Sequence, residues 1–137
     1  MIEYFNSIDG IKPSQLPGFF VDWPNPPSLE THLRILAKSA YVVIAVDTET
    51  AQVIGFITAI SDGLLSAYIP LLEVLPNYQN RGIGSRLIRL MLEQLGDLYM
   101  IDLLCDSDLQ GFYQRFGMQP ASGMIVRNYK SQAGVAK

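Results

Sequence analysis

Several residue types are scarce in this sequence, and each shortage excludes a class of protein. The 137 residues include one cysteine, Cys105, and one histidine, His32. A single cysteine excludes an intramolecular disulfide, which suits a reducing cytoplasm. One cysteine and one histidine also argue against a zinc site, so we predict no metal centre. Because Cys105 ends an apolar segment, we expect a core residue there rather than a nucleophile.

Long apolar runs and an excess of basic residues are also lacking. No run approaches about 18 apolar residues, and no basic stretch precedes an apolar one at the N-terminus, so we expect no membrane span and no signal peptide. The net charge is −3, from 10 basic and 13 acidic residues. Binding to a phosphate backbone depends on clustered Lys and Arg, so this charge argues against a nucleic-acid partner. We expect a cytoplasmic protein without a membrane partner.

Apolar residues, in contrast, are plentiful. They make up 49% of the chain, against 17% charged residues, which is enough to fill a hydrophobic core and excludes intrinsic disorder. A chain of this length forms one domain, so we predict a single domain over residues 1–137.

Apolar periodicity and turn signals predict the order of the secondary-structure elements. Residues 6–27 contain many Gly and Pro residues and are expected to be mainly loop. The predicted strands are residues 2–5, 41–46, 53–60, 65–74 and 98–105, with short strands near 118 and at 124–128. The predicted helices are residues 28–39, about 83–95 and 107–115, and the tail from 131 is expected to be loose. This order predicts an α/β (α+β) fold with a mixed, mostly antiparallel central sheet and flanking helices on both faces.

A glycine-rich turn, Gln79-Asn80-Arg81-Gly82-Ile83-Gly84, opens the second predicted helix. Such a turn leaves backbone N–H groups free at the positive end of the helix dipole, an arrangement that favours an anion such as a phosphate. Two known phosphate loops do not match. A P-loop requires Lys and then Ser or Thr, but Ser85-Arg86 follows here, and a dinucleotide loop requires a third glycine where Leu87 stands.

The turn instead resembles the acetyl-CoA loop of the GNAT superfamily of N-acetyltransferases, with its pattern Gln/Arg-x-x-Gly-x-Gly/Ala. The match extends over residues 72–84, and a second motif, residues 112–118, resembles the tyrosine-bearing helix of that family and the strand after it. The resemblance covers residues 40–130 best and the first forty poorly. It implies the GNAT fold, acetyl-CoA as co-substrate, and direct transfer of the acetyl group to a primary amine in a ternary complex.

The resemblance also implies a set of cofactor-binding residues. Backbone groups of Leu72, Glu73 and Val74 match the positions that pair with pantetheine and polarise the acetyl carbonyl. Asp106 stands where the family often has Asn, and a carboxylate there cannot donate an amide hydrogen bond. The loop residues that match the anion-binding positions, mostly through backbone amides, are Gln79, Asn80, Arg81, Gly82, Ile83, Gly84, Ser85 and Arg86.

Three residues are the main candidates for proton transfer, and a fourth is weaker. Tyr113 stands where the family's tyrosine donates a proton to the thiolate, although an amphipathic core residue would look the same. Glu73, beside the expected acetyl carbonyl, is the favoured base. Asp102 is the alternative, because a carboxylate inside an apolar strand has its pKa raised by burial. Either carboxylate could instead pair with Arg127. His32 is a weaker candidate, on a helix predicted to lie at the surface.

The acceptor amine is the least determined part of the prediction. The acidic chain mildly favours a cationic amine, and we expect a small molecule. The aromatic residues Phe19, Phe20 and Trp23 form either a wall for that amine or a satellite hydrophobic cluster. The alternatives are a peptide or protein acetyltransferase acting on N-termini or lysines, and a non-catalytic CoA-binding sensor module. A homodimer is compatible with folds of this kind, and the sequence leaves the oligomeric state open.

Overall fold

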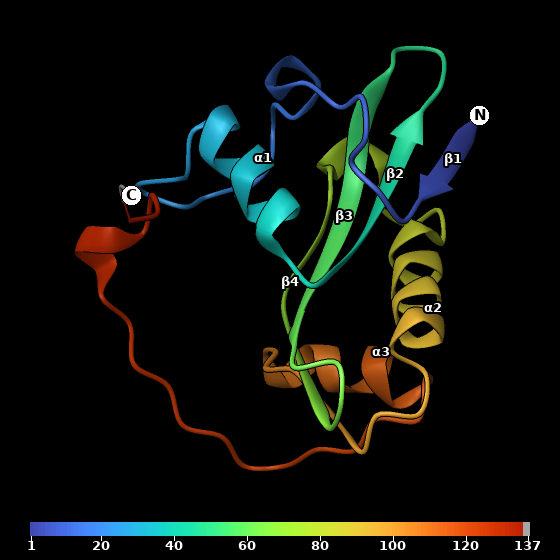
Figure 1. The fold of residues 1–137 in the computed structure, drawn as a ribbon, viewed down its shortest axis with the longest axis vertical. Helices are drawn as coiled ribbons and strands as arrows, with labels where there is room; N and C mark the ends of the chain where they lie inside the picture. Colours follow the sequence, from blue (N-terminus) through green and yellow to red (C-terminus); the bar gives the residue numbers. More distant parts are fainter. Residues whose placement is uncertain (136–137) are drawn as a thin grey trace.

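The computed structural model describes residues 1–135 and contains one five-stranded sheet with strand order β1-β2-β3-β4-β5 (Figure 1). Strands β1 to β4 are antiparallel neighbours, and β5 pairs with β4 in parallel. The mixed, mostly antiparallel sheet predicted from the sequence is therefore confirmed. The strands are Ile2–Phe5, Tyr41–Asp47, Gln52–Ser61, Ser66–Val74 and Met100–Asp102, and the helices α1 to α3 are Leu29–Lys38, Ile83–Leu95 and Gln110–Gln114.

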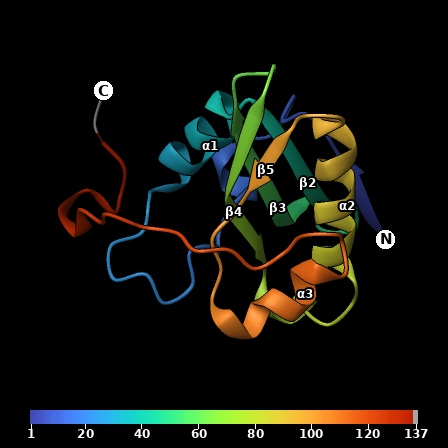
Figure 2. The same cartoon turned by 90° about the horizontal axis from the view of Figure 1, so that it is seen from below.

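Helices cover both faces of the sheet, as Figure 2 shows. On one face α2 buries residues that follow helical spacing, Leu87, Ile88, Met91 and Leu95. On the other face α1 and the loop before it pack a second core around Leu16, Phe19, Phe20, Leu36 and Phe56. Ser28 is the N-cap of α1, since its hydroxyl accepts a hydrogen bond of 3.1 Å from Thr31 N. Within residues 1–135, no helix is long and apolar enough to cross a membrane.

His32 does not lie at the surface, so the prediction of a surface helix is wrong at this position. Its side chain is 1% exposed and lies among the rings of Phe19, Phe20 and Phe56, with centroids 4.6 to 5.4 Å away. The loop before α1 folds over this face of the helix, and local periodicity cannot show such a cover. Burial lowers the pKa of His32 from 6.5 to about 4, which argues against a role as base near neutrality.

Strand β4 pairs with β5 only at its own beginning, where Ser66–Tyr68 face the whole of β5, Met100–Asp102. Beyond Tyr68 the register between β3 and β4 shifts, because Tyr68 faces Ile60 while Leu71 faces Thr58. The shift places an extra residue in β4 at Ile69-Pro70, as in a β-bulge, and Pro70 has no N–H to donate to a neighbouring strand. We call the unpaired stretch beyond this point, with residues 69–74 of β4 on one side, the splay.

The last third of the chain departs from the predicted elements. The predicted strand 98–105 is reduced to Met100–Asp102, and the predicted helix 107–115 is a 3-10 turn, Ser107–Leu109, followed by the short α3. The strands predicted near Met118 and at 124–128 do not form. These residues belong to a segment without strands, 118–135, which contains the 3-10 turn Tyr129–Ser131. We call this segment the arm, and it swings away from the sheet in Figure 1.

The end of the arm is attached, contrary to the loose tail predicted from Ser131. Gln132 Oε1 accepts a hydrogen bond of 2.9 Å from the backbone N of Asn25, in the loop before α1. The arm therefore bridges from α3 to the α1 side of the molecule.

Candidate active site

The loop before α2 presents backbone donors at a helix start. Asn80 and Gly82 adopt left-handed conformations, with φ of +63° and +79°, and Gly82 is the N-cap of α2. The first hydrogen bond inside the helix runs from Arg86 N to Gly82 O at 3.1 Å. The amides of Ile83, Gly84 and Ser85 thus have no hydrogen-bond partner within the helix. They lie at its N-terminus, which is the positive end of the helix dipole. This geometry suits a phosphate.

Side chains on either side fix the position of this loop. The Gln79 side-chain amide donates to Val74 O at 3.1 Å, which ties the loop to the end of β4. The Tyr78 hydroxyl donates to Asp47 Oδ2 at 2.6 Å, and the Arg81 guanidinium lies 5.1 Å from the centre of the Tyr78 ring. The bond from Tyr78, followed by one from the Glu49 backbone, lowers the pKa of Asp47. Sequence reasoning missed Asp47, which is 31 positions from its partner.

The backbone of β4 faces the splay at Leu72 and Val74. Val74 O accepts from Gln79 rather than from β3, so this carbonyl points away from β3. Backbone groups two residues apart in a strand point the same way, which directs the N–H and C=O of Leu72 toward the splay as well. The two predicted pantetheine-pairing positions are therefore open to a ligand lying alongside β4.

Helix α3 faces the start of α2 across this space. A Cβ added at Gly84 would lie 3.8 Å from Phe112 Cζ and 3.9 Å from Val74 Cγ2, so the helix start sits between β4 and α3. Arg115 Nη2 donates to Ser85 Oγ at 3.2 Å. Sequence reasoning assigned no role to Arg115, although it lies inside the second matching motif. It adds a positive charge beside the free amides.

Tyr113 lies half-buried on α3, beside the Phe112 ring at 4.9 Å. Burial raises the pKa of the Tyr113 phenol, and the neighbouring Cys105 adds to this shift. The phenol is therefore protonated at neutral pH, which is the state that a proton donor needs.

Glu73 projects to the opposite face of the sheet. Its neighbours Leu72 and Val74 pack against the core on the α2 side, whereas Leu71 packs against the core on the α1 side, as the alternation of a strand requires. Glu73 Oε1 accepts a hydrogen bond of 2.9 Å from Phe20 N, and Oε2 accepts one of 3.4 Å from Val21 N. The carboxylate is thus fixed against the loop that precedes α1.

Asp102 is exposed, so the prediction of a buried carboxylate in a covered strand is wrong. The physical reason is that β5 is the edge of the sheet, with only β4 as a neighbour. Asp106 is also exposed and precedes the 3-10 turn, where its C=O accepts from Leu109 N at 2.9 Å. Among the described residues, neither Glu73 nor Asp102 forms the ion pair with Arg127 that the sequence left open. Arg127 Nη1 instead donates to Val126 O at 3.3 Å.

The aromatic residues before α1 were predicted to form either a wall for the acceptor amine or a satellite hydrophobic cluster, and the structure assigns some of them to each. Phe19 and Phe20 are buried in the core, which supports the satellite cluster. Trp23 remains 38% exposed, with its ring 4.8 Å from that of Phe20. Only Trp23 is therefore free to contact an acceptor, at the edge of the face that holds Glu73.

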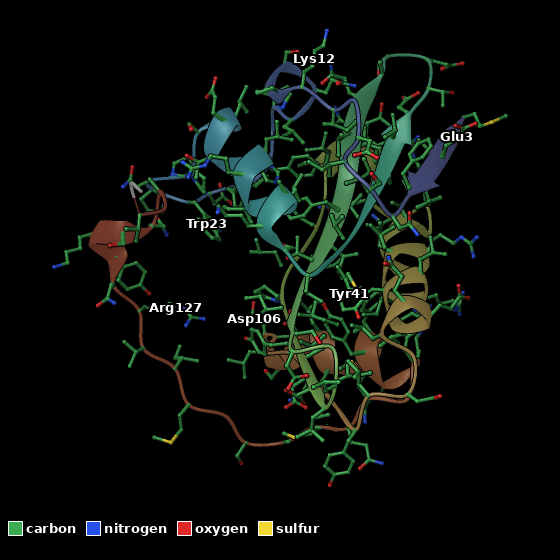
Figure 3. The ribbon with its side chains drawn as sticks, viewed as in Figure 1. Glu3, Lys12, Trp23, Tyr41, Asp106 and Arg127 are labelled. Atoms are coloured by element: carbon green, nitrogen blue, oxygen red, sulfur yellow. The ribbon has the colours of Figure 1, made fainter. Side chains whose placement is uncertain are left out.

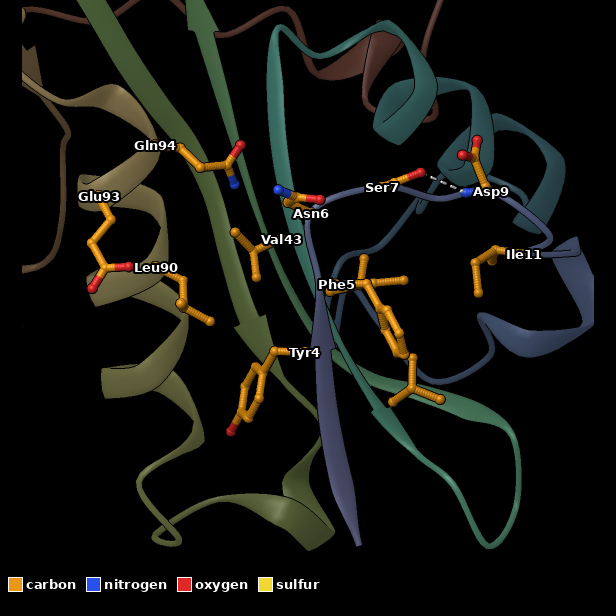
Figure 4. Close-up of a pocket in the computed structure, with 12 residues that line it drawn as sticks. Tyr4, Phe5, Asn6, Ser7, Asp9, Ile11, Val43, Leu90, Glu93 and Gln94 are labelled. Atoms are coloured by element: carbon orange, nitrogen blue, oxygen red, sulfur yellow. Dashed lines mark hydrogen bonds between the residues drawn. The ribbon is translucent and has the colours of Figure 1, made fainter.

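Surface hollows open on two sides of the part of the chain that the structure describes. One of about 650 Å³ lies beside β5 and is bounded by β5, α3 and the start of the arm, and its lining includes Asp102, Cys105 and Tyr113. We call it the β5 groove. The other, of about 710 Å³, lies between β1 and α2 and includes Tyr4, Asn6 and Gln94, but none of the predicted site residues (Figure 4). Among residues 1–135, no group of His, Cys, Asp and Glu is arranged to hold a metal ion.

Comparison with known proteins matches this arrangement to one family. The model of the acetyltransferase (GNAT) family matches residues 8–118, and the chain belongs to that family. Histone acetyltransferase TAP1 of Glycine max is 30% identical over 111 residues, which are 72% of this chain and 47% of the relative. The chain thus spans about half the length of that curated protein.

Solved structures agree with the fold. A candidate acetyltransferase from Deinococcus radiodurans is 48% identical, with a TM-score of 0.96 over 99% of this chain and 94% of that one. A GNAT-family acetyltransferase from Streptococcus pneumoniae is 30% identical, with a TM-score of 0.75 over 93% of this chain and 98% of that one. The first overlay covers nearly the whole chain and therefore includes the arm.

Proposed function

We propose that this chain transfers an acetyl group from acetyl-CoA to a primary amine, by direct transfer in a ternary complex and without an acyl-enzyme. The proposal rests on one observation: the groups suited to bind acetyl-CoA and the candidate base lie on opposite faces of the sheet. Free amides, the β4 backbone and Tyr113 lie on the α2 and α3 side, whereas the Glu73 carboxylate lies on the α1 side. The splay joins the two sides where pairing between β4 and β5 ends.

The residues present fit acetyl-CoA. The amides of residues 83–85, with Arg115 beside them, supply donors and positive charge for its diphosphate. A Cβ added at Gly82 would meet no protein atom within 4 Å, so this side of the loop is open to a ligand. Leu72 and Val74 would pair with the pantetheine amides through their backbone. Acetyl-CoA supplies the activated thioester, and the remaining chemistry falls to side chains of this chain.

Proton transfer is divided between two residues. Glu73 takes the proton of the attacking amine, directly or through a water, because its carboxylate is held on the acceptor side. The β4 backbone N–H facing the splay stabilises the negative charge that develops on the carbonyl oxygen. As the new C–N bond forms and the C–S bond breaks, Tyr113 donates its phenolic proton to the departing sulfur. Holding both reactants in one site supplies a large part of the acceleration.

The acceptor we favour is a small-molecule amine, and the main alternative is a peptide or protein. The named activity of the soybean relative, a histone acetyltransferase, favours a lysine side chain as this alternative. A non-catalytic CoA sensor would need neither a protonated tyrosine nor a fixed carboxylate, so Tyr113 and Glu73 argue against it.

The test is acetyl-CoA binding by calorimetry, followed by thiol release with added acceptors. One panel contains small primary amines and polyamines, and the other contains peptides with a free N-terminus or an internal lysine. Binding with release driven by small amines is the expected result. Release with peptides alone would establish the protein acetyltransferase, and binding without any release would favour the sensor. Absence of binding would overturn the acetyl-CoA site itself.

A further inference from the structure

The backbone of Phe20, in the loop before α1, is strained. Its φ is +60°, in the left-handed region, and Asp22 two residues on has a φ of +67°. Bulky side chains avoid this region because Cβ crowds the following carbonyl oxygen, and glycine or asparagine is usual where a turn requires it. Strained conformations persist only where the surrounding structure holds them, and they gather at functional sites. The turn at Phe20 is therefore a candidate for a functional role.

This turn directs two successive backbone amides at one carboxylate. Phe20 N donates to Glu73 Oε1 at 2.9 Å, and Val21 N donates to Glu73 Oε2 at 3.4 Å. Trp23 N donates to Phe20 O at 3.1 Å and closes the turn. Successive N–H groups beside a left-handed residue form an anion-binding concavity, known as a nest. Each carboxylate oxygen accepts one bond here and has a second lone pair, so the nest orients Glu73 and leaves it able to accept a proton.

Three aromatic rings hold the side chain of Phe20. Its ring centre lies 4.9 Å from that of His32, 6.2 Å from that of Phe56 and 4.8 Å from that of Trp23, which lies beside α1 in Figure 3. Phe56 stands directly opposite Glu73 in the pairing of β3 with β4, so the cluster is built next to the carboxylate. Return of Phe20 to an ordinary backbone conformation would move its ring out of this packed cluster, and the cluster therefore opposes that change.

We propose that Phe20 is a positioning residue for Glu73: the aromatic cluster holds its backbone in the left-handed conformation, and the resulting nest holds the carboxylate where it takes the proton of the acceptor amine. This role rests on the proposed function, in which Glu73 is the base. The ring of Phe20 acts only by fixing the backbone, and the backbone acts only through Glu73. Glycine adopts the left-handed conformation without strain, whereas alanine does not, so the two substitutions separate the ring from the backbone.

The first test compares Phe20→Ala with Phe20→Gly by steady-state kinetics with the best acceptor. Both variants lose the ring, so both should unfold at a lower temperature than the unaltered chain. In Phe20→Ala the strain remains without the rings that hold it, so the turn should relax and kcat should fall about 30-fold. In Phe20→Gly the nest can persist, and kcat should stay at least about 5-fold above that of the alanine variant. Acetyl-CoA affinity should stay within about 3-fold in both, because the nest lies on the α1 side of the sheet.

Phe19→Ala and Phe19→Gly form the matched control pair. Phe19 is also buried, at 9% exposure, but its φ is not positive and its amide does not bind Glu73, so glycine should be no more active than alanine there. Equal kcat for the two Phe20 variants, in a chain that is active when unaltered, would overturn the role of Phe20 and leave the proposed function standing. Absence of acetyl transfer by the unaltered chain would overturn the proposed function, and the role of Phe20 with it.

Hydrogen exchange of the unaltered chain and of Glu73→Ala tests the nest without any measurement of activity, and it does not require the Phe20 variants to fold. Loss of the carboxylate should speed exchange of the Phe20 amide at least about 10-fold. The Leu16 amide, which donates to Pro13 O at 3.0 Å in the same loop, is the internal control and should change by less than about 3-fold. An unchanged exchange rate at Phe20 would overturn the role of this residue, because its amide would then be protected by a group other than Glu73.

Discussion

The Tyr78 hydroxyl and Asp47 Oδ2 lie 2.6 Å apart, and this hydrogen bond ties the loop before α2 to the last residue of β2. The Tyr78 ring also carries the Arg81 guanidinium. A short bond to a carboxylate is a charge-assisted one and is stronger than a neutral pair. The contact therefore holds the phosphate-binding amides in place from outside the loop.

Tyr78→Phe removes this bond and keeps the ring beneath Arg81. We expect a loss of about 1 kcal/mol in the free energy of unfolding and a loss of about 3- to 10-fold in acetyl-CoA affinity. Urea unfolding and calorimetry measure the two effects. Tyr99→Phe, at an exposed tyrosine, is the control and should change neither. Unchanged affinity in Tyr78→Phe would show that the loop holds its shape without Asp47.

A comparison of Gly82→Ala with Gly63→Ala distinguishes two effects of an added methyl group: loss of space for the ligand and strain in the backbone. Both glycines have positive φ, +79° and +75°, and a Cβ at either meets no atom within 4 Å. Both variants should lose about 1 kcal/mol of stability, because alanine is strained in this conformation. Only Gly82→Ala should weaken acetyl-CoA binding, by at least about 10-fold. Equal binding by the two variants would contradict the assignment of the loop.

Tyr113→Phe should lower turnover about 100-fold and leave acetyl-CoA affinity within about 3-fold, because only the proton donor is lost. Steady-state kinetics with the best acceptor, together with calorimetry, check this. Tyr41→Phe, at a partly buried tyrosine of β2, is the matched control. Full activity in Tyr113→Phe would remove this residue from the mechanism.

Glu73→Gln and Glu73→Ala test the base and the loop anchor separately. Glutamine retains an oxygen that can accept from Phe20 N but cannot take a proton, whereas alanine loses both functions. We expect the glutamine variant to lose about 100-fold or more in kcat with little change in thermal stability. The alanine variant should also unfold at a lower temperature. If glutamine retained full activity, the base would be another group or water.

His32 should make the stability of the protein depend on pH between about 4 and 6.5. Its pKa is about 4 in the folded chain, below the ordinary 6.5, so the unfolded chain binds the proton first as the pH falls. The stabilisation is complete above pH 6.5 and is lost on acidification toward pH 4, by no more than about 3 kcal/mol. Urea unfolding of wild type and His32→Phe over this range measures the difference. Parallel pH profiles would contradict the burial of a neutral imidazole.

Local sequence pattern predicted the elements that are stabilised locally. The first four strands, α1 and α2 formed near their predicted bounds, because each carries its own periodicity and caps. Residues 124–128 have strand composition but no strand, since a strand also needs a neighbouring edge. The burial of His32 depends on the loop before α1 that covers it, and the exposure of Asp102 depends on the lack of a further strand beside β5 in the described sheet.

The candidate site also combines features that the local sequence predicts with features that it does not. The glycine loop could be predicted because consecutive residues determine where a helix begins, and the free amides follow from that. The roles of Asp47 and Arg115 could not be predicted from the sequence, because their contacts with Tyr78 and Ser85 join residues about thirty positions apart. The roles of Glu73 and Tyr113 stay predictions until the variants are measured.

Pro70 and the extra residue beside it also carry an evolutionary consequence. Deleting one residue at Ile69-Pro70 would restore the register between β3 and β4 and remove the one position that cannot donate. The residues that follow β5 could then pair with residues 69–74 of β4, which would close the passage between the faces of the sheet. We therefore expect related proteins to keep the irregularity in β4 even where the sequences of the loop before α1 and of the arm differ.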